Sequence, residues 1–240
     1  TILGIALVES AAIYGLIVAF KMIWTEAITL WAAIWAWLAI WLTWFWAWYW
    51  EWKLVIWALW AVSRNPKIRS KLMTFMVLFV ALVESAAIYW LVIAFKILSW
   101  VDASVQEYVY VWAWLAIWLA WLWVSIWQWN LSEKSIEIMW KNPAISWFML
   151  TVTILWVALV ESAAIYGLVV AFKVLSTTTV SGFAAIWAWL AIWLAWFWAW
   201  VWEWYIIRWA IDWINANTEL KSKTLAFMVL FVALVEVVAI

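Results

Sequence analysis

The chain has 240 residues, of which 73% are hydrophobic and 11% are charged, and its formal net charge is zero. A soluble domain carries about 25% charged residues, so this composition indicates a protein embedded in a membrane. Cysteine and histidine are both absent, which excludes thiol chemistry, disulfides, histidine-ligated metals and Ser-His-Asp catalysis. The balanced charge gives no reason to expect a nucleic-acid partner.

Long apolar segments follow one another along the chain, each longer than the roughly 18 residues that identify a membrane-spanning helix. They alternate between Trp-rich segments, called inner helices below, and segments with the motif Ala-Leu-Val-Glu, called outer helices. Short polar turns with Asn and Pro or Thr lead from each inner helix to the next outer one. In chain order we predict helices at about 1–24 (outer), 28–62 (inner), 68–98 (outer), 107–139 (inner), 145–175 (outer), 184–214 (inner) and from 220 (outer).

This alternation predicts an all-α membrane protein made of tandem transmembrane hairpins that form a ring or part of one. The units are a truncated outer helix at 1–24 and hairpins at 25–100, 101–178 and 179–240, the last with a truncated outer helix. No signal peptide is expected, because Thr1 opens directly into an apolar segment without a basic leader. Both chain ends fall within predicted helices, which favours an engineered or cropped chain.

One glutamate recurs in the middle of every outer helix. The four residues are spaced by 75, 77 and 75 positions, and they are Glu9, Glu84, Glu161 and Glu236. A charge at the centre of a bilayer costs roughly 2.5–3.5 kcal/mol. Four copies of so costly a residue, in one local sequence, indicate that the carboxylate acts in carrying an ion.

A polar residue of the inner helix precedes the glutamate by 33 positions in each hairpin. These residues are Glu51, Gln128 and Glu203. At 1.5 Å per residue, Glu51 and Glu84 lie about 22 and 27 Å from the turn at Pro66. The two acids of a hairpin are therefore predicted to meet at nearly one level.

A serine and a tyrosine follow the glutamate on three outer helices. On a helical wheel Ser85 and Tyr89 project about 100° and 140° from Glu84, so the two side chains lie close to each other. One outer helix cannot place all three groups around one ion, whereas two neighbouring outer helices can. We therefore predict a site between repeats, with the glutamate of one outer helix facing the hydroxyl groups of the next.

The stretch from Arg64-Asn65-Pro66 to Lys96 resembles the second half of the c subunit, the rotor-ring proteolipid of F-type ATP synthases. Leu82-Val83-Glu84-Ser85 with Tyr89 is similar to the version found in sodium-using rings. The resemblance implies that a helix-1 Gln or Glu, the helix-2 Glu, the following Ser and a Tyr hold Na⁺ or H⁺ between adjacent units. On this chain the implied ion ligands are Glu9, Glu84, Glu161, Glu236, Glu51, Gln128, Glu203, Ser10, Ser85, Ser162, Tyr14, Tyr89 and Tyr166.

The same resemblance implies no cofactor and no chemistry of the chain's own, since such a protein is the membrane rotor of a synthase. The implied partners are the lipid membrane, further copies in a ring, the stator a subunit and the central stalk. Basic residues gather at the Asn-Pro turns, so the positive-inside rule places these turns in the cytoplasm. The expected location is the inner (plasma) membrane of a bacterium, as a multi-pass protein.

The chain departs from the family pattern in two ways. Val237 stands where the other copies have serine, and tryptophans such as Trp50 and Trp52 stand in place of a run of helix-1 glycines. Trp90 likewise occupies the position of Gly15 and Gly167. Since glycine lets membrane helices approach closely, we interpret this as deliberate substitution in three joined c-like sequences, giving a wider inner layer or fewer specific contacts.

Two other interpretations stay open at this point. The first is an engineered membrane scaffold, derived from such rotor proteolipids, whose glutamates no longer transport anything. The second is the V-type proteolipid with naturally fused hairpins, which fits less well because fewer than one carboxylate per hairpin is expected there.

Overall fold

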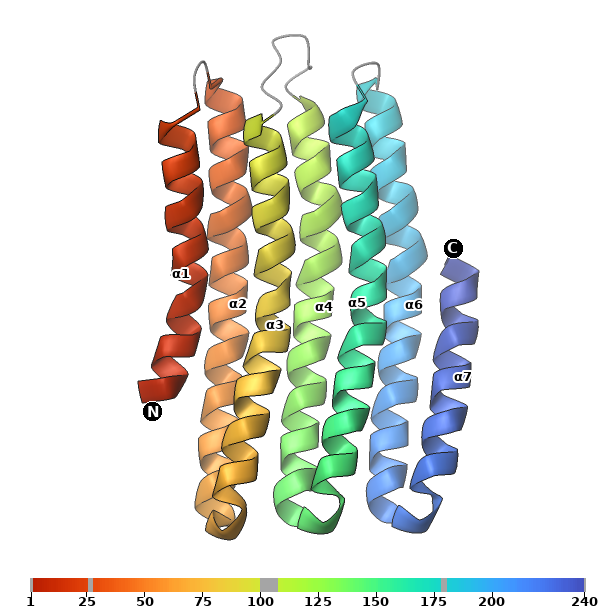
Figure 1. The fold of residues 1–240 in the computed structure, drawn as a ribbon. Helices are drawn as coiled ribbons and strands as arrows, with labels where there is room; N and C mark the ends of the chain where they lie inside the picture. The colour runs from red at the N-terminus through yellow and green to blue at the C-terminus, as the bar shows by residue number, and fades with distance from the viewer. Residues whose placement is uncertain (1, 26–27, 100–107, 178–180, 240) are drawn as a thin grey trace.

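The computed structural model describes residues 2–25, 28–99, 108–177 and 181–239. Over these residues the chain is helical, without strands, which confirms the predicted fold class. Seven α-helices stand side by side (Figure 1). Their bounds are α1 Ile2–Ile23, α2 Leu30–Arg64, α3 Arg69–Ser99, α4 Tyr108–Lys141, α5 Ser146–Ser176, α6 Gly182–Ala216 and α7 Lys221–Ala239. The predicted boundaries between hairpins, near 100 and 178, fall outside the described residues.

The helices form two contacting layers. The inner helices α2, α4 and α6 pack on one another in chain order, and the outer helices α1, α3 and α5 do the same. Each inner helix also packs on the outer helix that follows it. Figure 1 shows α1 reaching down from the loop end of the row, and α7 reaching up from the opposite end.

Tight turns connect α2 to α3, α4 to α5 and α6 to α7. Each turn is a short 3₁₀ helix, at Pro66–Ile68, Pro143–Ile145 and Thr218–Leu220. Proline suits the first position of such a turn because its fixed φ matches and its missing N–H is not needed there. Thr218 replaces proline in the third turn without changing its form. The Asn65 side-chain amide donates to the Trp140 carbonyl oxygen at 3.1 Å and so joins two hairpins at this end.

Hydroxyl side chains begin two of the inner helices. Thr29 accepts a hydrogen bond from the Ala32 N–H at 3.2 Å, and Ser181 accepts one from the Ala184 N–H at 3.3 Å. These bonds satisfy N–H groups that a helix start leaves without an intrahelical partner. α2 and α6 thus begin the same number of residues before Glu51 and Glu203, which keeps these two polar residues in register.

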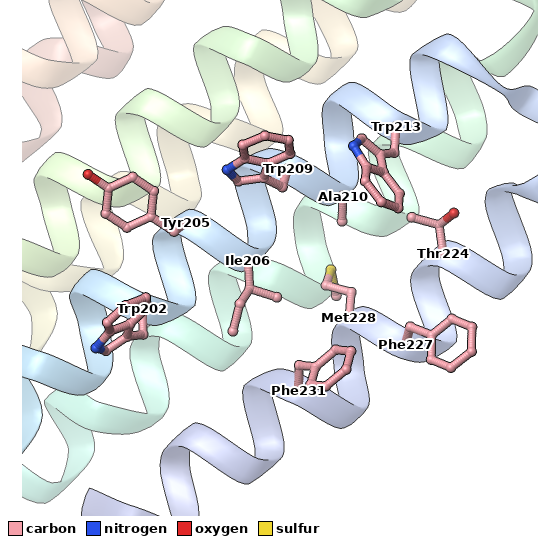
Figure 2. A pocket seen from close by; sticks show the side chains of 10 residues that line it. All are labelled: Trp202, Tyr205, Ile206, Trp209, Ala210, Trp213, Thr224, Phe227, Met228 and Phe231. Atoms are coloured by element: carbon pink, nitrogen blue, oxygen red, sulfur yellow. The ribbon is translucent and has the colours of Figure 1, made fainter.

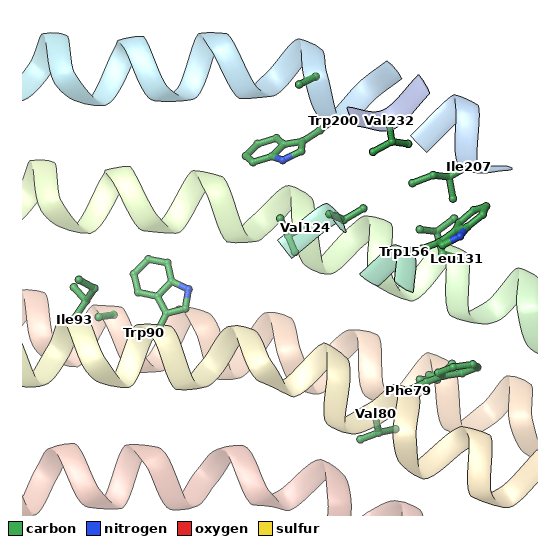
Figure 3. Close-up of a cluster of buried hydrophobic side chains, with 14 of the residues drawn as sticks. Phe79, Val80, Trp90, Ile93, Val124, Leu131, Trp156, Trp200, Ile207 and Val232 are labelled. Atoms are coloured by element: carbon green, nitrogen blue, oxygen red, sulfur yellow. The ribbon is translucent and has the colours of Figure 1, made fainter. Parts of the chain in front are cut away.

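The core lies between the two layers. Figure 3 shows Phe79 and Trp90 of α3 with Val124 of α4, Trp156 of α5 and Trp200 of α6. Each of these side chains is almost fully buried. Small residues are buried on the inner helices as well, where Ala32, Ala36, Ala39, Ala58 and Ala61 of α2 are inaccessible.

Tryptophan rings join adjacent inner helices. Trp50 stacks on Trp129 with ring centroids 4.6 Å apart, and Trp127 lies 4.8 Å from Trp204. Trp35 and Trp114 meet near the other end, at 5.3 Å. These specific ring contacts speak against the expected loss of specific contacts, and the wider inner layer stays a prediction.

Three stretches of the described chain are long and apolar enough to cross a membrane: Pro66–Ser99, Pro143–Ser176 and Phe183–Ala216, with 34 residues each. Such a helix is about 50 Å long and exceeds the roughly 30 Å of a hydrocarbon core. Large apolar side chains are exposed on the outer surface of the row, among them Ile88, Val92, Ile165 and Val169. The chain is a multi-pass membrane protein.

A buried hydrogen bond joins α4 and α5. Thr153 Oγ1 lies 2.6 Å from Ser135 Oγ of α4 and 2.7 Å from the Met149 carbonyl oxygen of its own helix, and the Thr153 and Ser135 side chains are buried. We expect Thr153→Val to lower the free energy of unfolding by roughly 0.6–1.7 kcal/mol, the range of interhelical hydrogen bonds in membranes. The measurement is the unfolding midpoint in mixed detergent micelles.

Thr151→Val provides the matched control, because Thr151 is exposed and, among the described residues, its hydroxyl bonds only to the Trp147 carbonyl of its own helix. An equal loss of stability in both variants would show that the Thr153–Ser135 bond contributes nothing between the helices.

Candidate functional site

The polar residues singled out in the sequence converge in three clusters, each formed by two outer helices and the inner helix between them. The middle cluster surrounds Glu161 of α5. Gln128 of α4 donates from Nε2 to Glu161 Oε1 at 2.7 Å, and Ser85 of α3 donates to the same oxygen at 2.5 Å. Tyr89 of α3 lies close enough to interact electrostatically with Glu161. This cluster contains all four of its sequence-predicted members.

Helix geometry explains why the serine comes from the neighbouring outer helix. Ser85 follows Glu84 directly and is rotated by about 100° from it, toward α5. Its hydroxyl also lies 2.6 Å from the Leu82 carbonyl oxygen of its own helix. A serine hydroxyl has a single hydrogen, so Leu82 and Glu161 compete for it. The backbone carbonyl thus holds the hydroxyl in place beside the acid.

The third cluster surrounds Glu236 of α7. Ser162 of α5 donates to Glu236 Oε1 at 2.6 Å and lies 2.7 Å from the Leu159 carbonyl oxygen, as in the middle cluster. Glu203 of α6 is fully buried and interacts electrostatically with Glu236. Tyr166 lies on α5 and is about one-third exposed.

The first cluster surrounds Glu84 of α3. The Tyr14 hydroxyl of α1 hydrogen-bonds Glu84, and Glu51 of α2 is fully buried beside it. The side chain of Ser10, the serine expected here, lies outside the described residues. Glu9 is exposed on α1 and belongs to none of the three clusters.

The comparison with protein families agrees with this geometry. Residues 34–97 and 111–173 each match the family of the ATP synthase C subunit, and together they make up more than half of the chain. The chain belongs to the ATP synthase C-subunit family. No individual curated protein matches it with significance. The two matched stretches correspond to α2 with α3 and to α4 with α5, so this C-subunit protein contains at least two tandem copies of the family unit.

Buried oxygen atoms without a donor mark all three clusters of this C-subunit protein. Among the described residues, none donates a hydrogen bond to Gln128 Oε1 or to either carboxylate oxygen of Glu51 and Glu203. All three side chains are fully buried. A buried acceptor that lacks a donor is costly, and a cation or a proton removes the cost. Carboxylate, amide and hydroxyl oxygens are hard ligands that suit small hard cations.

We did not predict from the sequence the ion pairs that lie near the turns. Lys134 of α4 lies 3.3 Å from Glu137 of its own helix and 3.3 Å from Asp212 of α6, and Lys141 also contacts Glu137. The signal was present, because Lys134, Glu137 and Lys141 follow helical i, i+3 and i, i+4 spacing. Exposed pairs of this kind contribute about 0–1 kcal/mol each. They lie toward the turn end of α4 and α6 and belong to none of the three acid clusters.

A groove of about 930 Å³ lies between α6 and α7 (Figure 2). Aromatic side chains line it, including Trp209 and Trp213 of α6 and Phe227 and Phe231 of α7, and Thr224 supplies its side-chain hydroxyl. No acid or base is among its lining residues, so the groove is an apolar surface and not part of the ion clusters.

The serine bonds predict a selective effect of single substitutions. Ser85→Ala removes a donor to Glu161, and hydrogen bonds to charged groups contribute about 1.5–3 kcal/mol. We expect the cation concentration that half-protects Glu161 from carbodiimide to rise about tenfold or more. Labelling of each glutamate is read by peptide mass spectrometry.

Ser162→Ala is the matched control. It should change the protection of Glu236 and leave Glu161 as it was. Equal effects of either variant on both glutamates would contradict sites built between neighbouring outer helices.

Proposed function

We propose that this chain is an ion-translocating component of the rotor ring of an F-type ATP synthase. It binds Na⁺ or H⁺ at Glu84, Glu161 and Glu236, in the middle of the membrane. The observation that carries the proposal is the convergence on Glu161 Oε1 of an amide from α4 and a hydroxyl from α3. Two donors from different repeats stabilise the ionised form of this acid, and Gln128 Oε1, which no described residue donates to, is an oxygen ligand available for a cation between the repeats.

The proposed mechanism follows from charge neutrality. In the apolar layer each glutamate is neutralised by its ion, so the loaded site can move past lipid. The ionised form is stable only beside an opposite charge and water, which a stator subunit provides. Rotation of the ring carries loaded sites from one water channel to the other and couples ion flow to torque. The chain itself makes and breaks no covalent bond.

Ring assembly is part of the proposal. The edges of the row expose large apolar side chains, among them Leu16 on α1, Trp24 directly after α1, Trp209 on α6 and Phe227 on α7. Further repeats packed against these edges would cover them and would supply neighbours to the outermost clusters. The central stalk would contact the turn end, where Lys67, Arg69 and Lys223 lie exposed. By the positive-inside rule this end faces the cytoplasm, in the plasma membrane of a bacterium.

A membrane scaffold that transports nothing is the alternative, and the tryptophans are the observation that favours it. Carbodiimide, which reacts with protonated buried carboxyls, separates the two functions. We expect labelling of Glu161 and its protection by Na⁺ if sodium is the ion, or labelling without protection at mildly alkaline pH if protons are. A chain whose glutamates do not react at all would be a scaffold.

Substitution of one glutamate gives a stricter test of transport. All three sites turn together on one chain, and every site must pass the stator. We therefore expect Glu161→Gln to abolish ATP-driven ion uptake into vesicles that contain the assembled synthase, not to reduce it by a third. Ser176→Ala, at the exposed end of α5 away from these turns, should leave uptake unchanged. Uptake that persists at two-thirds in the Glu161 variant would contradict the proposal.

A further inference from the structure

Tryptophan and glycine replace each other between copies of the outer helix. The stretch Ser-Ala-Ala-Ile-Tyr is followed by Gly15 in the first copy, by Trp90 in the second and by Gly167 in the third, and leucine comes next in all three. Because the flanking residues are identical, the position has the same place in each repeat. The largest side chain and the smallest therefore alternate where nothing else in the local sequence changes.

A second position of the same helix repeats the exchange. Thr-Ile-Leu is followed by Gly4 in the first copy and by Trp156 in the third, five residues before the motif glutamate in each. Helix α5 thus has tryptophan at one of the two exchanging positions, Trp156, and glycine at the other, Gly167. The choice between the two residues varies from position to position and does not distinguish one copy from another.

The inner helices contain a related exchange. Trp48 and Trp200 stand three residues before Glu51 and Glu203, whereas the residue three before Gln128 is Ser125. Ser125 is buried, with 4% of its surface exposed. This place in the repeat therefore accepts a small side chain, which glycine resembles in size and tryptophan does not.

Packing makes the exchange difficult to accommodate. Gly15 lies close to α2, since a Cβ atom there would be 3.4 Å from Ile40 Cγ2. At the equivalent position the Trp90 ring is almost fully buried, and its centroid lies 6.3 Å from that of Trp114. Even a few methylene groups added to a packed interface force side chains and backbone to shift, and an indole is far larger. Two copies of one helix cannot pack in the same way with these two residues.

Hydrogen bonding gives independent support. Buried indole N–H groups normally find an acceptor, and the interior of a bilayer has no water to replace a missing one. Glycine at the same positions would bring no side-chain donor. Among the described residues, no acceptor is found for the buried indole N–H groups of Trp35, Trp114, Trp118, Trp129, Trp140, Trp156, Trp189, Trp193, Trp200 and Trp204.

The composition agrees with the exchange. The 240 residues include 34 tryptophans and four glycines. Glycine makes up about 7% of an average protein, and it is more frequent in membrane helices than in soluble ones. The shortage of glycine and the excess of tryptophan have one common explanation if tryptophan stands at positions that belong to glycine.

Translation connects the two residues, although their chemistry does not. The codon UGA is a stop signal in the standard genetic code, tryptophan in some variant codes and glycine in others. A gene in which UGA and the GGN codons all mean glycine would mix them freely between repeats, as synonymous codons are mixed. The same gene translated with a tryptophan code would give the pattern of Gly15, Trp90 and Gly167.

We infer that the cell that makes this protein inserts glycine at positions 90 and 156, and at the matching tryptophan positions of the inner helices, because the codons there are UGA and its code reads UGA as glycine. The matching positions include 50, 127 and 202, directly before Glu51, Gln128 and Glu203. Glycine and alanine would then face each other between the helices, as in membrane helices that pack closely. The inference concerns the chain itself and does not depend on the proposed function.

The gene provides the first test. Sequencing of genomic DNA from the source cells should find UGA at positions 90 and 156, and also at positions 48 and 200. A single-base change from GGG to UGG also converts glycine to tryptophan, so UGG at positions 90 and 156 would overturn the inference.

Peptide mass spectrometry of the protein purified from its source cells is the decisive measurement. Fragment ions that cover residues 85–92 and 153–160 should show glycine at positions 90 and 156. A chain synthesised with tryptophan at both positions is the reference, because it shows that the tryptophan peptides are detected. Gly15 and Gly167 are internal controls and should be glycine in both samples. Tryptophan at positions 90 and 156 in the cell's own protein would overturn the inference.

Assembly gives a further readout. The tryptophan chain and a chain with glycine at the inferred positions are produced in the same host, and their assemblies in detergent are compared by mass measurement. We expect one uniform assembly from the glycine chain and several species from the tryptophan chain, because only the former packs every repeat alike. A uniform tryptophan assembly beside a heterogeneous glycine one would contradict the inference. Ion transport does not enter this readout, so its failure would bear on the proposed function alone.

Discussion

An ionised carboxylate inside the apolar layer has to meet a cation or a proton, and the arrangement of the helices follows from that constraint. Glu161 sits where α3, α4 and α5 come together, with its Oε1 held by Gln128 and Ser85. Ser162 and Glu236 repeat the same contact one repeat further along. Since the hydrogen bonds of each of these two clusters come from two repeats, a single hairpin contains only part of a cluster, and the neighbouring repeat supplies the rest.

The sequence predicted much of this arrangement. The 33-residue separation within hairpins placed Gln128 at the level of Glu161, and the 100° step from Glu84 to Ser85 predicted the serine's contact with the neighbouring repeat. Both predictions depend only on the regular rise and rotation of a helix, so the number of residues between two positions is enough to make them. Helix existence and alternation were predicted for the same reason, with ends within a few residues of those found.

Contacts that depend on side-chain conformation could not be predicted in this way. The Asn65 bond to Trp140 and the Lys134 contact with Asp212 join residues whose approach depends on the crossing of two helices. We did not predict the stacking of inner-helix rings, such as Trp50 on Trp129, because the size of these side chains suggested that the inner helices lie further apart. Buried rings such as those of Trp114 and Trp156 contribute to helix packing, but among the described residues their indole N–H groups find no acceptor, which is a conflict between apolar packing and hydrogen bonding.

The most direct test of the account is a high-resolution density map of the assembled protein in sodium. The account predicts density for a cation, or a hydrogen-bonded proton site, bounded by Glu161, by Gln128 Oε1 from α4 and by the Ser85 hydroxyl from the neighbouring outer helix α3. A map in which Glu161 binds only groups of its own hairpin, with Ser85 turned toward lipid, would contradict it.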